Sequence, residues 1–164
     1  MSTNTQQTML QPDGQNAAST SAIPTVLYDS VNRAITAEVV VSRPPGASAI
    51  TISVPPLTIP HLGTWTLVWD LRVISVGLTA QLANPGIVLQ TLPPKVTLLA
   101  GPTGTATQWS VRLENNVSVA SSFKYDIIVK TPTHTSRQES RVDLRPEKDE
   151  PVPVQDPVIP PPKR

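Results

Sequence analysis

The stretch Thr64-Trp65-Thr66-Leu67-Val68-Trp69-Asp70-Leu71 decides the fold class of this sequence. In an extended chain, successive side chains point to opposite faces, so Trp65, Leu67, Trp69 and Leu71 form one apolar row. This period of two predicts a β-strand with one buried face. A strand of this kind needs a second layer of structure to cover its apolar row.

Two later stretches show the same alternation. Ala106 to Glu114 places Trp109, Val111 and Leu113 in one row, and Ser122 to Lys130 does the same with Phe123, Tyr125, Ile127 and Val129. The three rows together predict a core centred on five aromatic residues, which are Trp65, Trp69, Trp109, Phe123 and Tyr125.

Shorter runs rich in β-branched residues surround these long strands and are separated by Pro and Gly. They are Thr25 to Tyr28, Ile35 to Ser42, Ala49 to Val54, Leu78 to Leu82, Ile87 to Leu89 and Val96 to Leu99. Asn84-Pro85-Gly86 favours a tight turn and Gly101 to Thr105 a hairpin loop. Since no segment shows a capped helical period, we expect an all-β, two-sheet antiparallel sandwich, immunoglobulin-like or jelly-roll-like, with disordered N- and C-terminal tails.

Composition divides the 164-residue chain into three parts around one core. Residues 1–22 are rich in Ser, Thr, Gln and Asn and predict a disordered polar arm. Residues 23–136 predict the sandwich domain. Residues 137–164 hold 12 of the 25 charged residues and end in a Pro-rich run, so they predict a disordered tail.

Charge and cysteine content exclude several classes of function. The net charge is +1 and the charges of the middle segment are scattered singly, which argues against nucleic-acid binding. No run approaches 18 apolar residues and the start lacks a signal-peptide pattern, so we expect a cytoplasmic protein without membrane contact. The chain has no Cys, which removes disulfides and thiolate sites.

The residues that could carry catalysis do not form a recognisable site. His61 and His134 are far apart in the sequence, and neither has a second ligand at the spacing of a zinc site. No Ser lies in a nucleophile elbow, and Asp29, Asp70 and Asp126 lack triad partners. We therefore expect no enzyme activity, catalytic residue, metal or cofactor, and a hydrolase is the least favoured alternative.

The C-terminal tail is the candidate partner-binding segment. It embeds apolar residues in a Pro-rich run, which a purely solvating linker does not require. The candidate residues are Val152, Val154, Asp156, Pro157, Val158 and Ile159.

Several phrases of the sequence resemble a group of small bacterial immunoglobulin-like β-sandwich proteins of unassigned function. They are Trp65-Thr66-Leu67-Val68-Trp69, Asn84-Pro85-Gly86-Ile87, Thr107-Gln108-Trp109-Ser110, Phe123-Lys124-Tyr125 and Asp156-Pro157-Val158-Ile159. The resemblance implies a sandwich that ends in a short Asp-Pro-containing tail, and it brings no catalytic residue. The polar arm and the charged spacer after His134 are longer than in that group.

These features indicate two functions outside enzymology. The first is a non-catalytic interaction or accessory module that displays its Pro-rich tail to a protein partner of unknown identity. The alternative is a self-associating structural subunit of a virion or surface appendage, since a weakly charged sandwich with a polar arm suits a shell.

Overall fold

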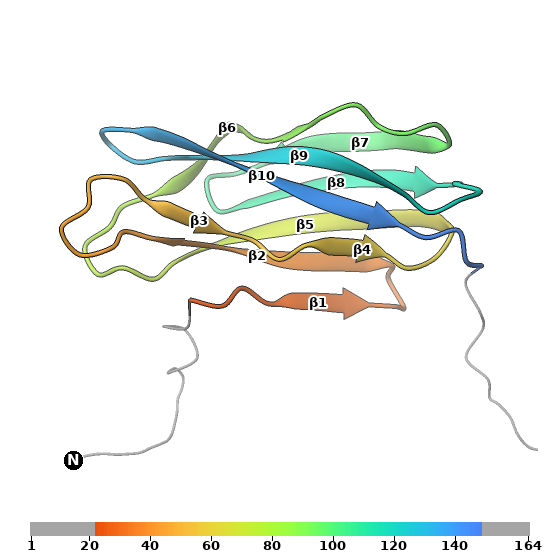
Figure 1. Ribbon diagram of the computed structural model, residues 1–164, viewed down its shortest axis with the longest axis horizontal. Coiled ribbons are helices and arrows are strands. Elements are labelled where there is room, and N and C mark those ends of the chain that lie inside the picture. Colours follow the sequence, from red (N-terminus) through yellow and green to blue (C-terminus); the bar gives the residue numbers. More distant parts are fainter. Residues whose placement is uncertain (1–21, 149–164) are drawn as a thin grey trace, which may run out of the picture.

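The computed structural model describes residues 22–148, which form ten strands in two layers (Figure 1). The predicted all-β sandwich is confirmed. The strands are β1 (Val26–Asp29), β2 (Ala34–Ser42), β3 (Thr51–Ser53), β4 (Leu57–Ile59), β5 (Gly63–Val73), β6 (Gln81–Leu89), β7 (Val96–Gly104), β8 (Gln108–Asn115), β9 (Ser121–Lys130) and β10 (Thr135–Leu144). The predicted arm up to residue 21 and the tail from residue 149 lie outside the described residues.

The first layer is a six-stranded sheet in the order β1-β2-β5-β8-β7, with β3 also paired to β2. The second is a four-stranded sheet in the order β4-β10-β9-β6. Most pairs are antiparallel, as expected, but β2 pairs with β5 and β4 with β10 in parallel. Both sheets are therefore mixed.

The core lies between the layers and contains the predicted aromatic residues, none of them more than 5% exposed. Trp69 lies at its centre, opposite Ala37 of β2 and Trp109 of β8. Its Nε1 donates a 3.0 Å hydrogen bond across the layers to the Tyr125 hydroxyl. Burial raises the pKa of Tyr125, and hydrogen bonds from Ser140 and Trp69 oppose this shift in part.

The predicted domain boundary at Ser136 is wrong, because β10 continues to Leu144. It pairs with β9 along its whole length, from Thr135 opposite Lys130 to Leu144 opposite Ser121. Its last part contributes Val142 and Leu144 to the core, at 0% and 1% exposure. A strand can be held by its backbone ladder even where most of its side chains are polar.

Two segments expected as loops also belong to strands. Asn84-Pro85-Gly86 lies within β6, at a register shift between Leu82 and Ile87. Residues 101–104 complete β7, which has two register shifts of its own. Such shifts place extra residues in a strand, so turn-forming residues can occur there without ending it.

Candidate interaction surfaces

One end of the sandwich is held together by a buried amide. Asn115, at the end of β8, is 0% exposed. Its Nδ2 donates 3.0 Å hydrogen bonds to the carbonyl oxygens of His61 and Arg145, and its Oδ1 accepts from the Val117 backbone N–H. One side chain thus joins two loops and the segment after β10, and its buried polar atoms are satisfied.

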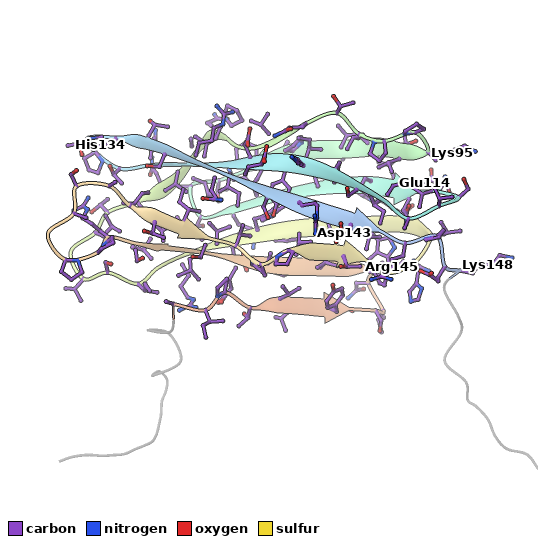
Figure 2. The ribbon with its side chains drawn as sticks, viewed as in Figure 1. Lys95, Glu114, His134, Asp143, Arg145 and Lys148 are labelled. Carbon is purple, nitrogen blue, oxygen red and sulfur yellow. The ribbon has the colours of Figure 1, made fainter. Side chains whose placement is uncertain are left out.

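The segment that follows β10 is anchored at this same end. The backbone N–H of Leu62 donates to the Glu147 carbonyl at 2.8 Å, and that of Arg145 donates to the Ile59 carbonyl at 3.1 Å. Figure 2 shows Arg145 and Lys148 at this end of the molecule, with Lys95 and Glu114 nearby. The chain beyond Lys148 therefore starts from a fixed position on the sandwich.

The predicted partner-binding residues Val152, Val154, Asp156, Pro157, Val158 and Ile159 lie outside the described residues. Their role in binding a partner therefore stays a prediction.

The two histidines lie at opposite ends of the sandwich. His61 adjoins the Asn115 amide, while Figure 2 shows His134 at the far end, in the turn between β9 and β10. Within residues 22–148 no group of three His, Cys, Asp or Glu side chains could hold a metal ion. The ring Nδ1 of His61 is buried without a hydrogen-bond partner, and the His134 Nδ1 lies 2.9 Å from the Thr133 hydroxyl.

The outer face of β9 and β10 carries charges of both signs that pair with each other. The pairs are Lys124–Glu139 at 3.7 Å, Arg137–Asp126 at 3.3 Å and Arg141–Asp143 at 3.1 Å. Exposed ion pairs contribute little stability, and alternating signs create no extended field. This face therefore offers no single-sign surface to a nucleic acid or an anionic membrane.

A shallow hollow lies where β6 approaches the turn between β7 and β8. It measures about 200 Å³, and its lining includes Gln81, Asn84, Trp109 and Lys130. The Trp109 Nε1 is buried there without a hydrogen-bond partner. A second hollow of about 350 Å³ shares Gln81 and Lys130 with the first. The polar side chains that line the two hollows are amides, threonine hydroxyls, the Trp109 indole and one ammonium, with no acid–base pair among them.

The opposite side of the molecule exposes apolar residues along an edge strand. Around β1, Ile23 is 73%, Leu27 71%, Tyr28 53% and Val31 88% exposed. Within residues 22–148 β1 pairs with β2 alone, and Figure 1 shows it as the outermost strand on that side. Sequence reasoning identified this strand but not its exposed edge, although Val26, Leu27 and Tyr28 place apolar side chains on both of its faces and it lacks Pro, Gly and Lys.

The fold defines a two-sheet β-sandwich protein. No helix in residues 22–148 is long and apolar enough to cross a membrane.

No protein-family model and no curated protein matches this chain. Among solved structures, the chain is similar to a variant of an endo-fucoidan hydrolase from glycoside hydrolase family 107, with 9% identity and a TM-score of 0.31. The match covers 85% of this chain but 16% of the hydrolase chain. The resemblance to immunoglobulin-like bacterial proteins stays a prediction.

Proposed function

We propose that this chain is a non-catalytic, cytoplasmic interaction module that presents its Pro-rich C-terminal segment to a protein partner. The observation that carries the proposal is the anchoring of Arg145 to Ile59 at the end of β4 and of Glu147 to Leu62 in the loop between β4 and β5. This attachment fixes the root of the segment to a rigid body. A partner that binds the segment is thereby held near one defined end of the sandwich.

The chemistry of the segment supports the same function. Val152, Val154, Val158 and Ile159 are interspersed with Pro. Pro-rich segments favour an extended polyproline conformation, so they lose less entropy on binding than other flexible peptides. Extended apolar peptides of this type dock into aromatic-lined grooves.

The structure determines where the chain must be cut to test this function. A chain that ends at Ser136 would lack Val142 and Leu144 and would lose most of β10. A chain that ends at Lys148 keeps every described strand and the anchoring hydrogen bonds. Affinity purification from the native host should compare this truncated chain with the full chain, and we expect one specific companion to be lost.

A matched pair of variants in the full chain then separates recognition from tail length. Val158→Ser with Ile159→Ser removes two apolar side chains, while Pro161→Ser with Pro162→Ser changes two neighbouring positions. We expect the first pair to weaken binding of the purified companion at least tenfold, which corresponds to about 1.4 kcal/mol, and more than the second pair does. Equal retention by the full and truncated chains would contradict the proposal.

A self-assembling structural subunit is the second candidate function, and the exposed edge of β1 favours it. Sedimentation of the full chain distinguishes the two candidates, because a shell or appendage protein forms large particles at high concentration.

A further inference from the structure

The free edges of the two sheets are not equally protected against pairing with another strand. β7 is interrupted by two register shifts and contains Pro102, and β6 is interrupted by one and contains Pro85. β3 and β4 have three residues each. Bulges, Pro and short length are the usual devices that keep sheet edges from associating. β1 is also short, with four residues, but its register is regular and it contains no Pro, and its one charged residue is Asp29 at its end.

The backbone of β1 has hydrogen-bonding groups directed to this free edge. The Glu38 N–H donates to the Thr25 carbonyl at 2.9 Å, and the Thr25 N–H donates to the Glu38 carboxylate at 3.0 Å, so the backbone of Thr25 is directed toward β2. In an antiparallel ladder this direction alternates from residue to residue, which turns the backbone of Thr25 and Leu27 toward β2. The N–H and C=O groups of Val26 and Tyr28 therefore point away from the sheet.

We propose that the edge of β1 binds the same edge of a second copy of this chain, antiparallel and about a two-fold axis at Leu27. Such an interface is isologous and closes as a dimer. It joins the two six-stranded sheets into one continuous sheet. The inference rests on β1 alone and is independent of the function proposed for the C-terminal segment.

The two-fold axis restricts the register of this pairing. An axis perpendicular to the sheet passes between one residue and its own copy. A centre at Val26 would place Tyr28 opposite Pro24, which has no N–H, and a centre at Asp29 would bring two carboxylates together, so Leu27 and Tyr28 are the registers to compare. With Leu27 at the centre, Val26 of each copy faces Tyr28 of the other, and all their free N–H and C=O groups can pair within the strand. With Tyr28 at the centre, Val26 faces Ser30, which lies outside β1. The Leu27 register therefore makes more hydrogen bonds.

The same register is also self-complementary in its side chains. Leu27 meets Leu27 of the second copy on the outer face, and Val26 meets Tyr28 as an aromatic and β-branched pair. Ile23 of each copy approaches Val31 of the other at the ends of the pairing. The exposed apolar residues of this edge thus become contacts of one another.

Charge on this edge does not oppose the pairing. Asp29 is the acidic residue of β1, and backbone and side-chain hydrogen bonds from Asn32 hold its pKa below the ordinary value. In the Leu27 register each Asp29 faces Thr25, and the two carboxylates are four residues apart along the ladder, about 13 Å. This separation exceeds the Debye length of roughly 8 Å at physiological ionic strength, so their repulsion is screened.

The size of the contact predicts a weak dimer. A four-residue strand with its flanking residues buries less than the roughly 800 Å² per partner of a standard interface. We therefore expect a dissociation constant between about 10 µM and 1 mM.

Sedimentation equilibrium of the full chain tests the dimer directly. We expect the wild type to pass from monomer to dimer as its concentration rises to about 1 mM. Leu27→Lys should weaken the dimer at least tenfold, because the axis brings the two introduced charges together. Val119→Lys adds the same charge at a position 68% exposed, close to the 71% of Leu27, and should leave the dimer unchanged.

Disulfide crosslinking tests which residues of the two β1 strands face each other, and it works even when the dimer is weak. The chain has no Cys, so Leu27→Cys introduces one thiol per copy. In the Leu27 register these thiols lie across a non-hydrogen-bonded pair with Cα atoms about 4.5 Å apart, within the range that a disulfide spans. Mild oxidation should link Leu27→Cys into dimers at least tenfold faster than the equally exposed Val119→Cys.

Three outcomes would overturn the proposal. A wild-type chain that stays monomeric to about 1 mM, with no faster crosslinking of Leu27→Cys than of Val119→Cys, would exclude the pairing. A dimer that appears only after residues 1–21 are removed would assign the edge to the chain's own N-terminal segment. If the wild type formed assemblies larger than dimers and Leu27→Lys abolished them, the contact at β1 would be an open, repeating one and not a closed two-fold contact.

Discussion

On the side of the sandwich formed by β6 and the β7–β8 turn, a backbone hydrogen bond from Leu82 to Ala106, 2.8 Å long, connects the two layers. On the side formed by β1 and β4, a side-chain hydroxyl makes the connection, from Tyr28 to the Thr58 carbonyl at 3.0 Å. The first side has irregular strands and a nearly buried Trp109, and the second has a regular strand and an exposed Tyr28. The side with the irregular strands β6 and β7 is thus covered by side chains and backbone contacts between the layers. The side with the regular strand β1 keeps an edge that is available for pairing with another strand.

Close approach of the backbone explains why the first side contains glycines. A Cβ added at Gly86 would lie 2.9 Å from the Trp109 Nε1, and one added at Gly104 would lie 2.5 Å from the Trp109 Cγ. The backbones of β6 and β7 therefore both contact the indole of Trp109. Among the described residues, no side chain fills the space between the layers on the β1 side in this way, and Tyr28 there is 53% exposed.

We expect the largest loss of stability from removing the Trp109 indole. Trp109→Ala should lower the free energy of unfolding by about 3–5 kcal/mol, because it leaves a cavity between the layers. Chemical denaturation followed by circular dichroism measures the change. A loss below about 1 kcal/mol would show that β6 and β7 close over the core without Trp109.

Regular alternation made much of this fold predictable. β5, β8 and β9 each combine one apolar row with one polar row, and their aromatic residues form the core as predicted. These strands pack in the middle of their sheets or against a long neighbour, where burial of one row determines the pattern.

The sequence did not reveal the full extent of strands that are specified by their neighbours. In β10 the residues Ser136, Gln138 and Ser140 lie in the same row as the buried Val142. The inward row is therefore polar over the first part of the strand and apolar only at its end. β9 supplies ten paired positions that hold β10 in place without a continuous apolar row. In β6 and β7 the Pro and Gly residues fill bulges, which local rules interpret as turns. The free edge of β1 depends on what lies beside it in space, and periodicity does not report this.

An acid-dependent effect should distinguish the start of β1 from the rest of the sandwich. Arg72 holds both carboxylate oxygens of Glu38, at 3.0 and 3.1 Å, and the Thr25 backbone N–H donates to the same carboxylate at 3.0 Å. Burial raises the pKa of Glu38, but the hydrogen bonds from Arg72 and Thr25 outweigh it and bring the pKa below 4.5. A lowered folded-state pKa stabilises the fold above the unfolded-state value, and this stability is lost as the pH falls through the folded-state value.

Glu38→Gln should therefore cost about 1 kcal/mol at neutral pH and flatten the loss of stability below about pH 4.5. The protection factor of the Thr25 amide, which is the exchange rate of the unfolded chain divided by the observed rate at the same pH, should be lower in the variant at neutral pH and should fall in the wild type at low pH. Glu139→Gln breaks the exposed 3.7 Å pair with Lys124 and serves as the control, with a cost below about 0.5 kcal/mol. Equal costs for the two variants would show that Glu38 does not anchor β1.

The smallest effect is expected where the β1 side is tied to β4. Tyr28→Phe removes the hydroxyl that donates to the Thr58 carbonyl, but water can reach this half-exposed site and replace the bond. The cost should stay below about 1 kcal/mol. Tyr125→Phe removes the same atom from a residue that is 0% exposed and leaves the Trp69 Nε1 without its partner, which should cost about 1–3 kcal/mol. Urea denaturation of both variants compares one chemical change in two environments. If Tyr28→Phe proved the more costly, the β1 side would be closed as firmly as the core, and its edge would be a poor candidate for pairing with a second copy.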